Sequence, residues 1–343
     1  MLFPEHRRAI LKNRGEQTVT VRKPTGDAGS PADPASELRS ELARKVALLI
    51  GAAEKQTTSI PGLTLHRRTA PTAPCSVTYE PGVIVIAQGR KQVNLGGNTF
   101  VYDSSRYLLT SVDLPVITRV VEATEQVPCL AMALKLQMPV VRELLSREEI
   151  EVAEAPSDSP GMTTGETTVE FLNACCRLLD LLENPKDIPF LSGLIEREII
   201  YRVLRGPEGA RLRAIATLGD QSHRTAKAIA WIRSNYAQPL RVEDLAEMAG
   251  MGVSTLHHHF RALTALSPLQ YHKQIRLQTA RARMLLDGLD ATSAAIEVGY
   301  ESVSQFNREY SRLFGQPPMR DVRNLRSPGA PVMEPITNAP SAA

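Results

Sequence analysis

One stretch of the sequence, residues 253–263, combines an apolar face with side chains that can form hydrogen bonds to nucleobases. Leu256, Phe260 and Leu263 recur at positions i, i+4 and i+7, a spacing that places them on one side of a helix. The other positions hold short or hydrogen-bonding side chains: Ser254, His257, His258 and Arg261. Such side chains can donate to, or accept from, base edges in the major groove of DNA.

A second stretch, residues 303–313, repeats the pattern. Phe306, Tyr310 and Leu313 have the same helical spacing as the apolar residues of the first stretch. The matching hydrogen-bonding positions are Ser304, Asn307, Arg308 and Ser311. A helix face that is merely solvated usually carries Glu and Lys, so we interpret both helices as readers of DNA.

Each of these helices is the second helix of a unit that occurs twice, about fifty residues apart. Residues 245–250 (LAEMAG) align with residues 294–299 (AAIEVG), where a small residue permits close helix packing and a glycine supplies the turn. Helix, glycine-containing turn and helix form the helix-turn-helix pattern of DNA-binding proteins. The second copy has one extra residue in its turn, near Glu301.

A single helix, predicted over residues 267–287, joins the two units. Ser267 provides the N-cap, Pro268 the first helical position and Gln270 the partner of a capping box, and Gly288 ends the helix. Twenty helical residues span about 30 Å. Because successive major-groove faces of B-DNA lie about 34 Å apart, this helix would hold the two units at nearly one turn of DNA.

The preceding part of the chain is rich in strand signals. Short segments with β-branched or aromatic residues, separated by turn residues, predict strands at 77–80, 83–88, 91–95, 99–102, 107–110, 116–122 and 130–135. This spacing indicates a sandwich or a small, cupin-like barrel, which commonly encloses a ligand cavity. The predicted fold class is α+β multidomain, with an N-terminal β-barrel or sandwich, a helical hairpin and a C-terminal all-α domain.

Helices are predicted around these strands, at residues 36–51, 138–145, 166–183 and 189–205, with residues 151–165 as a loop. The last two helices form an amphipathic hairpin that either provides a dimer interface or covers the barrel. The expected domain organisation is a disordered tail (1–35), a sensor and dimerisation domain (36–211), a linker (212–223), a DNA-binding domain (224–326) and a second disordered tail (327–343).

Length and composition fit this organisation. A chain of 343 residues is too long for one typical core, and 43% hydrophobic with 22% charged residues is ordinary for a soluble protein. The sequence has neither an apolar run of membrane-spanning length nor a signal peptide, so no membrane partner is expected. Four cysteines, two of them adjacent, do not form a disulfide framework, and a cytoplasmic location is expected.

The charge is uneven along the chain. Residues 224–326 contain 14 Lys and Arg against nine Asp and Glu, a net charge of +5, whereas the whole chain carries +3. A positive excess in the helical region is what a phosphate-rich partner requires.

Several motifs stand at fixed spacing in the C-terminal region: 244–246 (DLA), the helix at 254–261, 267–271 (SPLQY), 298–302 (VGYES), 304–306 (SQF) and 308–310 (REY). Others occur earlier, at 81–83 (PGV), 88–91 (QGRK), 106–108 (RYL) and 113–115 (DLP). The first group resembles the AraC/XylS family of transcriptional regulators, and the second resembles the N-terminal sensor domain of a family subgroup. The chain departs from the family pattern at Arg241, where a capping Ser or Thr is usual, and at Met319-Arg320, where Tyr-Arg is common.

The resemblance implies roles for particular residues. Family base contacts map onto Ser254, His257, His258, Ser304, Asn307 and Arg308. The residues better placed for phosphate contacts are Thr255, Arg261, Ser302, Gln305 and Arg312. The resemblance also implies a homodimeric regulator of transcription that binds double-stranded DNA, works with RNA polymerase and responds to a small-molecule effector, with activation as the favoured outcome.

An effector pocket in the barrel would take its polar lining from Tyr79, Gln88, Lys91, Tyr102, Tyr107 and Arg119. The alternative is a barrel that is only structural or dimerising. Cys75 and Cys129 are either redox or electrophile sensors or buried, inert cysteines.

The histidines of the chain do not have the spacing of a metal site. Three consecutive histidines, 257–259, point about 100° apart on a helix and cannot converge on one ion. A cupin-like metal site needs several histidines on neighbouring strands. The chain has no histidine between His66 and His223, so we expect none in the strand region. We therefore predict no catalytic residue, metal or cofactor; a cupin-like enzyme and an interaction module that does not read DNA are the alternative functions.

Overall fold

The strands of the N-terminal half make two antiparallel sheets. The computed structural model describes residues 33–146 and 159–326. In these residues the six-stranded sheet has the order β1-β2-β9-β4-β7-β10 and the four-stranded sheet the order β3-β8-β5-β6. The strands are β1 (Lys55–Thr57), β2 (Leu63–Arg68), β3 (Cys75–Tyr79), β4 (Gly82–Gln88), β5 (Arg90–Leu95), β6 (Asn98–Asp103), β7 (Arg106–Thr110), β8 (Leu114–Glu122), β9 (Cys129–Lys135) and β10 (Met162–Glu166).

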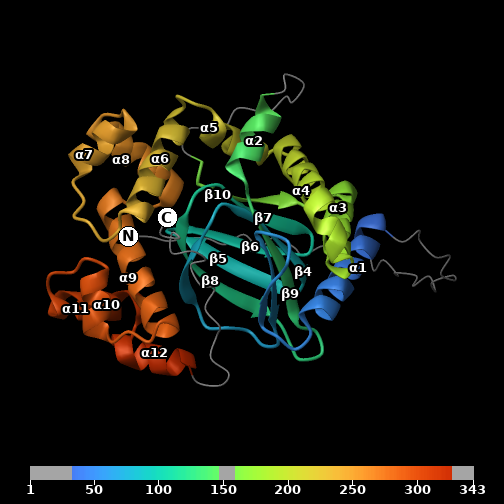
Figure 1. Ribbon diagram of the computed structural model, residues 1–343, viewed down its shortest axis with the longest axis horizontal. Helices are drawn as coiled ribbons and strands as arrows, with labels where there is room; N and C mark the ends of the chain where they lie inside the picture. The colour runs from blue at the N-terminus through green and yellow to red at the C-terminus, as the bar shows by residue number, and fades with distance from the viewer. Residues whose placement is uncertain (1–32, 147–158, 327–343) are drawn as a thin grey trace, which may run out of the picture. The chain divides into compact units, whose positions relative to one another are not determined.

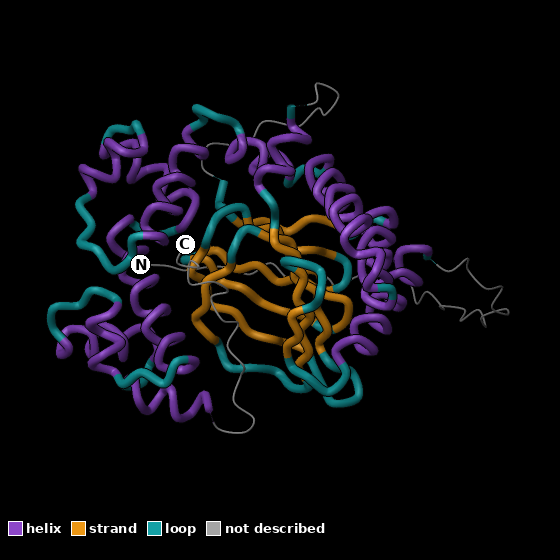
Figure 2. The backbone as a smooth tube through the Cα atoms, viewed as in Figure 1, coloured by secondary structure: helices purple, strands orange, loops and turns teal. Residues whose placement is uncertain are grey.

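The two sheets pack face to face as a sandwich and, in the described residues, do not close into a barrel (Figure 2). Alternation along each strand sets the two faces. In β4, Val83 and Val85 join the core under the helices, whereas Ile86 joins Val93 and Tyr102 of the other sheet in the core between the sheets. The sandwich form of the predicted fold is therefore the one that the chain adopts.

Helices cover the outer face of the six-stranded sheet (Figure 1). They are α1 (Pro34–Ile50), α2 (Met138–Leu145), α3 (Val169–Asp180) and α4 (Ile188–Arg205), with the short 3₁₀ turns η1 (Leu181–Glu183) and η2 (Pro185–Asp187) between α3 and α4. Leu42 and Val46 of α1 and Ile199 of α4 are buried in this core. The predicted helical hairpin is present as α3 and α4.

Several predicted boundaries differ from the structure. Residues 162–165 were expected in a loop but lie in β10, whose Met162 pairs with Thr110 of β7. This segment is ordered by backbone pairing at the edge of the sheet. Its amino-acid composition does not indicate a strand. The strand region also contains one histidine, His66 of β2, where none was expected. The predicted tail at 1–35 reaches the described residues only at its end, where α1 begins at Pro34, and the tail at 327–343 lies outside them.

The C-terminal half is helical. Its helices are α5 (Gly209–Ala216), α6 (Gln221–Ser234), α7 (Val242–Ala249), α8 (Val253–Thr264), α9 (Pro268–Leu286), α10 (Ala291–Glu297), α11 (Val303–Phe314) and α12 (Pro318–Arg326). The segment expected as a linker, 212–223, is largely helical, because Leu212 and Ile215 of α5 are buried and order it. None of the helices in the described ranges is both long enough and apolar enough to span a bilayer.

Turn glycines and caps fix the two helix-turn-helix units, α7–α8 and α10–α11. Gly250 ends α7 with a φ of 66°, and Gly299 follows α10 with a φ of 86°, in the left-handed region that favours glycine. A Cβ atom on Gly299 would also collide with the carbonyl group of Ala237. The predicted capping box of α9 is present: Ser267 Oγ accepts from Gln270 N at 3.3 Å, and Gln270 Oε1 accepts from Ser267 N at 3.1 Å.

Candidate nucleic-acid interface

Helix α8 buries its apolar side and exposes the other. Leu256 and Phe260 are fully buried, and the Phe260 ring lies edge-on to Tyr271 of α9 with centroids 5.4 Å apart. The predicted DNA contacts Ser254, Thr255, His258 and Arg261 are exposed, and His257 is half-buried. The cap of α7, Arg241, makes no side-chain capping bond, as its departure from the family pattern suggests.

Helix α11 is arranged in the same way. Phe306 and Tyr310 are fully buried, whereas the predicted contacts Ser302, Ser304, Gln305, Asn307, Arg308 and Arg312 are exposed. Two of these also stabilise the helix itself. Ser302 Oγ accepts from Gln305 N at 3.3 Å as the N-cap, and Gln305 Nε2 donates to Glu309 Oε1 at 3.3 Å.

Helix α9 ties the two units together through its polar side chains. Lys273 Nζ lies 2.9 Å from Glu309 Oε1 on α11. Arg276 Nε donates to the carbonyl of Tyr236 at 2.6 Å, and its Nη2 donates to the carbonyl of Gln238 at 2.9 Å. One helix thus contacts both the second reading helix and the chain that leaves α6, which fixes the spacing of the two units.

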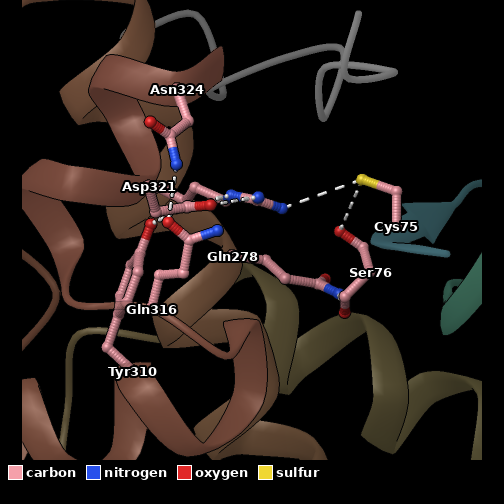
Figure 3. Close-up of polar contacts among 8 residues, drawn as sticks. Cys75, Ser76, Gln278, Tyr310, Gln316, Asp321 and Asn324 are labelled. Atoms are coloured by element: carbon pink, nitrogen blue, oxygen red, sulfur yellow. Dashed lines mark hydrogen bonds and ion pairs between the residues drawn. The ribbon is translucent and has the colours of Figure 1, made fainter. Parts of the chain in front are cut away.

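A buried ion pair joins α9 to α12 and contacts Tyr310 of α11 (Figure 3). Arg281 of α9 donates to Asp321 of α12 with two bonds of 2.7 and 2.8 Å, and the two side chains are 7% and 6% exposed. Tyr310 Oη donates to the same carboxylate at 2.7 Å, and the Arg281 guanidinium lies 4.3 Å from the centroid of the Phe314 ring. Sequence reasoning did not assign this role; the available signal was a charged residue between apolar positions of α9, Leu277 and Met284.

The helical half also contacts the four-stranded sheet. The polar contacts across this boundary include Gln278–Ser76, Gln278–Thr78, Arg281–Cys75, Arg233–Glu80, Arg233–Asp113 and Tyr271–Asp113. Gln278 Nε2 donates to Ser76 Oγ at 3.0 Å, and Arg281 Nη1 approaches Cys75 Sγ at 3.8 Å (Figure 3). Because ten of the eleven predicted DNA contacts stay exposed, this boundary leaves the reading faces accessible.

One buried histidine supports the first unit. His272 of α9 is 7% exposed, and its Nε2 lies 2.8 Å from the carbonyl oxygen of Tyr236. Burial, with a smaller contribution from the neighbouring Arg276 guanidinium, lowers the pKa of His272 to about 4. The imidazole is therefore neutral and donates to this carbonyl at neutral pH.

Of the six residues predicted for an effector pocket, Lys91 and Arg119 line one small cleft in the sandwich, and Tyr79 lines another. Tyr79, Lys91 and Tyr102 lie in the core between the sheets, where Lys91 is paired in register with Tyr102 and its Nζ donates to Tyr79 Oη at 3.5 Å. Tyr107 stacks on Phe171 under the helices, on the other face of the six-stranded sheet. The remaining two are engaged locally: Gln88 Nε2 donates to the Pro128 carbonyl at 2.8 Å, and Arg119 Nη2 donates to Gln92 Oε1 at 2.7 Å.

The described residues contain no group of three or more His, Cys, Asp and Glu side chains that could hold a metal ion. Cys129, Cys175 and Cys176 are buried free thiols, and Cys75 is half-buried. Burial raises the pKa of the Cys129 thiol and of the Cys176 thiol, so neither has the thiolate character of a reactive cysteine.

Comparison with known families matches both halves of the chain. Residues 59–211 match the AraC-type transcriptional regulator N-terminus, and residues 245–324 match a helix-turn-helix domain. Among curated proteins, the chain is 25% identical over 253 residues to the HTH-type transcriptional regulator ExsA of Pseudomonas aeruginosa, covering 73% of this chain and 88% of ExsA.

Other relatives match over shorter stretches. The HTH-type transcriptional regulator ArgR of P. aeruginosa is 24% identical over 153 residues, 45% of this chain and 46% of ArgR. The HTH-type transcriptional activator RhaS of Yersinia pestis is 28% identical over 105 residues, 31% of this chain and 38% of RhaS. The chain thus spans less than half the length of these two relatives.

Among solved structures, ToxT from Vibrio cholerae O395 bound to (E)-4-(8-methylnaphthalen-1-yl)but-3-enoic acid has a similar fold. Its TM-score is 0.52 at 11% identity, and the match covers 79% of this chain and 98% of ToxT.

Proposed function

The chain belongs to the AraC/XylS family of transcriptional regulators, and from this premise we propose that it regulates transcription by binding specific sequences in double-stranded DNA. The observation that carries the proposal is the pair of exposed, hydrogen-bonding faces on α8 and α11. The base contacts proposed are Ser254, His257, His258, Ser304, Asn307 and Arg308, and the phosphate contacts are Thr255, Arg261, Ser302, Gln305 and Arg312.

The two readers enter successive major grooves in this proposal. Arg308 can donate two bonds to guanine, and Asn307 can pair with adenine. The 19 residues of α9 give a length of about 28 Å, close to the groove spacing, and its contacts with α11 and with the end of α6 keep that spacing fixed.

The β-sandwich has the regulatory role in this proposal. A small-molecule effector bound in the sandwich changes the arrangement of the helical half. The sandwich contacts the helical half through polar side chains of β3 and α9. ToxT, the structural neighbour, was solved with an organic acid bound, and this agrees with effector control. No enzymatic step is part of the proposal, and the expected setting is the cytoplasm, where DNA and RNA polymerase are present.

A homodimer completes the proposal, with activation of transcription as its outcome. Phe190, Leu191 and Leu194 lie on one side of α4 and are 77%, 41% and 64% exposed. A run of large apolar side chains at this spacing is typical of a protein contact surface. We place a second copy of the chain there.

The test uses DNA fragments from upstream of the chain's own gene and of its neighbours. Fluorescence anisotropy over a salt series should show tight binding to one fragment and a shuffled fragment of equal length at least about 1000-fold weaker. Affinity should fall steeply with salt in both cases, because phosphate contacts release counterions. Equal affinity for both fragments would contradict specific reading.

A further inference from the structure

The second reading helix is held at one carboxylate. The side chain of Glu309 on α11 is only 16% exposed, and donors from three elements converge on it. Lys273 Nζ of α9 lies 2.9 Å from Glu309 Oε1, and Tyr300 Oη, in the turn between α10 and α11, donates to Glu309 Oε2 at 2.8 Å. The third donor is Gln305 Nε2 of α11, which lies 3.3 Å from Oε1.

These donors keep the carboxyl group ionised. Burial by itself raises the pKa of Glu309, but the hydrogen bonds from Lys273, Tyr300 and Gln305 outweigh it and leave the pKa below its ordinary value. Charge-assisted hydrogen bonds are stronger than those between neutral groups. Glu309 therefore joins α11 firmly to α9 and to the turn that precedes α11.

Tyr300 continues this connection towards the first unit. Its ring lies edge-on to Phe306 of α11 with centroids 5.3 Å apart, and the Arg276 guanidinium of α9 lies 5.8 Å from the Tyr300 centroid. The same guanidinium donates to the carbonyls of residues 236–238, in the segment that leads into α7. A polar path thus runs from this segment through Arg276 and Tyr300 to Glu309.

The turn of the second unit also touches this segment directly. Gly299, the residue before Tyr300, lies so close to the Ala237 carbonyl that a Cβ atom would collide with its oxygen. Tyr236 packs against the core that contains α7 and α8 and against the core of α10 and α11. One connecting helix sets the distance between two units, but a second contact is needed to fix the rotation of one unit about that helix. The docked turn supplies this second contact.

The equivalent positions of the first unit hold different side chains. Fifty residues before Glu309, α8 has His259, and the residue that follows the turn glycine is Met251 where the second unit has Tyr300. The carboxylate junction is therefore a feature of the second unit and is not required by the helix-turn-helix pattern itself.

We propose that Glu309 is a positioning residue for DNA reading: through Lys273 and Tyr300 it fixes the rotation of α11 about α9, and with it the spacing at which the second reader meets its groove. This inference rests on the proposed function, because it concerns how the two readers are held relative to each other on DNA. Without the junction, α11 turns about α9 and reaches sites at other distances from the first site.

The test measures tolerance to spacing with the full-length chain. One base pair is inserted between the sites of the two readers in the tightly bound fragment, which moves one site by about 3.4 Å along the DNA and about 34° around it. By fluorescence anisotropy, the wild type should bind the longer fragment at least about 10-fold more weakly than the original, because a misplaced reader loses at least one base contact. This ratio does not depend on the folded fraction of the sample, since both fragments meet the same population.

Two variants and a control are compared with the wild type. In Glu309→Ala, and in Tyr300→Phe, which removes only the hydroxyl group, the ratio should fall to about 3-fold or less, because α11 adapts to the longer spacing. Glu297→Ala is the control. It removes a carboxylate of α10 that also pairs with α9, at 3.0 Å from Arg283, but on a more exposed surface, and it should keep the wild-type ratio.

A wild-type ratio in either Glu309→Ala or Tyr300→Phe would overturn the proposal, and so would an equal fall in Glu297→Ala. Specific binding by the wild type with equal affinity for both spacings would overturn the positioning role and leave the proposed function standing. A wild type that binds neither fragment in preference to a shuffled one would overturn the proposed function, and the positioning role with it.

Discussion

Arg308 lies exposed on α11 between the buried Phe306 and Tyr310, so its guanidinium projects from the face proposed to meet DNA. A bidentate contact with guanine discriminates against other bases by about 1–3 kcal/mol. Arg308→Ala should therefore weaken binding to the preferred fragment by that amount and relax the preference at one base pair. Binding to every single-base variant of the fragment, measured by anisotropy, checks this.

Arg312 supplies the matched control, because it is also an exposed arginine of α11 but is assigned to a phosphate. Arg312→Ala should weaken binding to all sequences alike and lower the salt dependence by about one counterion. If Arg308→Ala behaved in the same way, its assignment as a base contact would be wrong.

The buried pair of Arg281 and Asp321 is a second residue-scale test. Asp321→Ala leaves the Arg281 charge buried and removes the acceptor of Tyr310, so the helical half should lose about 3–5 kcal/mol of unfolding free energy. Asp287→Ala removes a comparable bond of 2.7 Å to Arg283, but on an exposed surface, and should cost about 0.5 kcal/mol or less. Urea unfolding compares the two, and equal losses would contradict a special role for the buried pair.

His272 predicts a pH dependence of stability. Its pKa of about 4 in the folded chain lies below the value of about 6.5 expected when unfolded. Between these values the unfolded state binds more protons, so the unfolding free energy decreases as the pH falls from about 6.5 towards 4. The contribution of His272 to the unfolding free energy is fully present above about pH 6.5. About 2 kcal/mol of it is lost when the pH reaches 5.

The measurement is urea unfolding at pH 7.5, 6 and 5 for the wild type and His272→Gln, whose amide still donates to the Tyr236 carbonyl. As the pH falls to 5, the unfolding free energy of the wild type should decrease by about 2 kcal/mol more than that of His272→Gln. His258→Gln makes the same change of side chain at an exposed position of α8 and controls for the substitution itself. A parallel pH dependence in His272→Gln would contradict the prediction.

At the scale of elements, the helices of the second half could be predicted from the sequence because caps and apolar spacing are local signals. The capping box of α9 and the turn glycines 250 and 299 mark their helix ends directly. Strand β10 lacks such a signal, since its Met162–Glu166 backbone is ordered by pairing with β7. The helix in 212–223 depends in the same way on burial of Leu212 by distant residues.

The exposed side of α4 leads to a prediction about assembly. If Phe190 and Leu194 contact a second copy, the double variant Phe190→Ser, Leu194→Ser should shift the chain from dimer to monomer, because two large apolar contacts are lost. Analytical ultracentrifugation over a range of concentrations measures the shift. Leu218→Ser, which changes a leucine that is 78% exposed away from α4, should leave the dimer intact. A dimer that persists in the double variant would place the interface elsewhere.

In the whole molecule, the exposure of the candidate DNA contacts could be predicted because each group of contacts lies on a single helix. Side chains on α8 and α11 are exposed as expected, because helical periodicity alone decides which of them face outward. The effector residues were not predictable as a set, because the pairing of strands decides their neighbours. Lys91 meets Tyr79 in the core and shares a small cleft with Arg119, whereas Tyr107 stacks on Phe171 on the other face of the six-stranded sheet.

In the proposed complex, one chain contacts two successive major grooves through α8 and α11. Hydroxyl-radical footprinting on the preferred fragment tests this arrangement, with the wild type, the double variant Ser254→Ala, His258→Ala and the double variant Asn307→Ala, Arg308→Ala. We expect two protected windows per subunit, centred about 10 base pairs apart, and each double variant should lose a different one of them. A single window, or two windows that both survive in each variant, would contradict it.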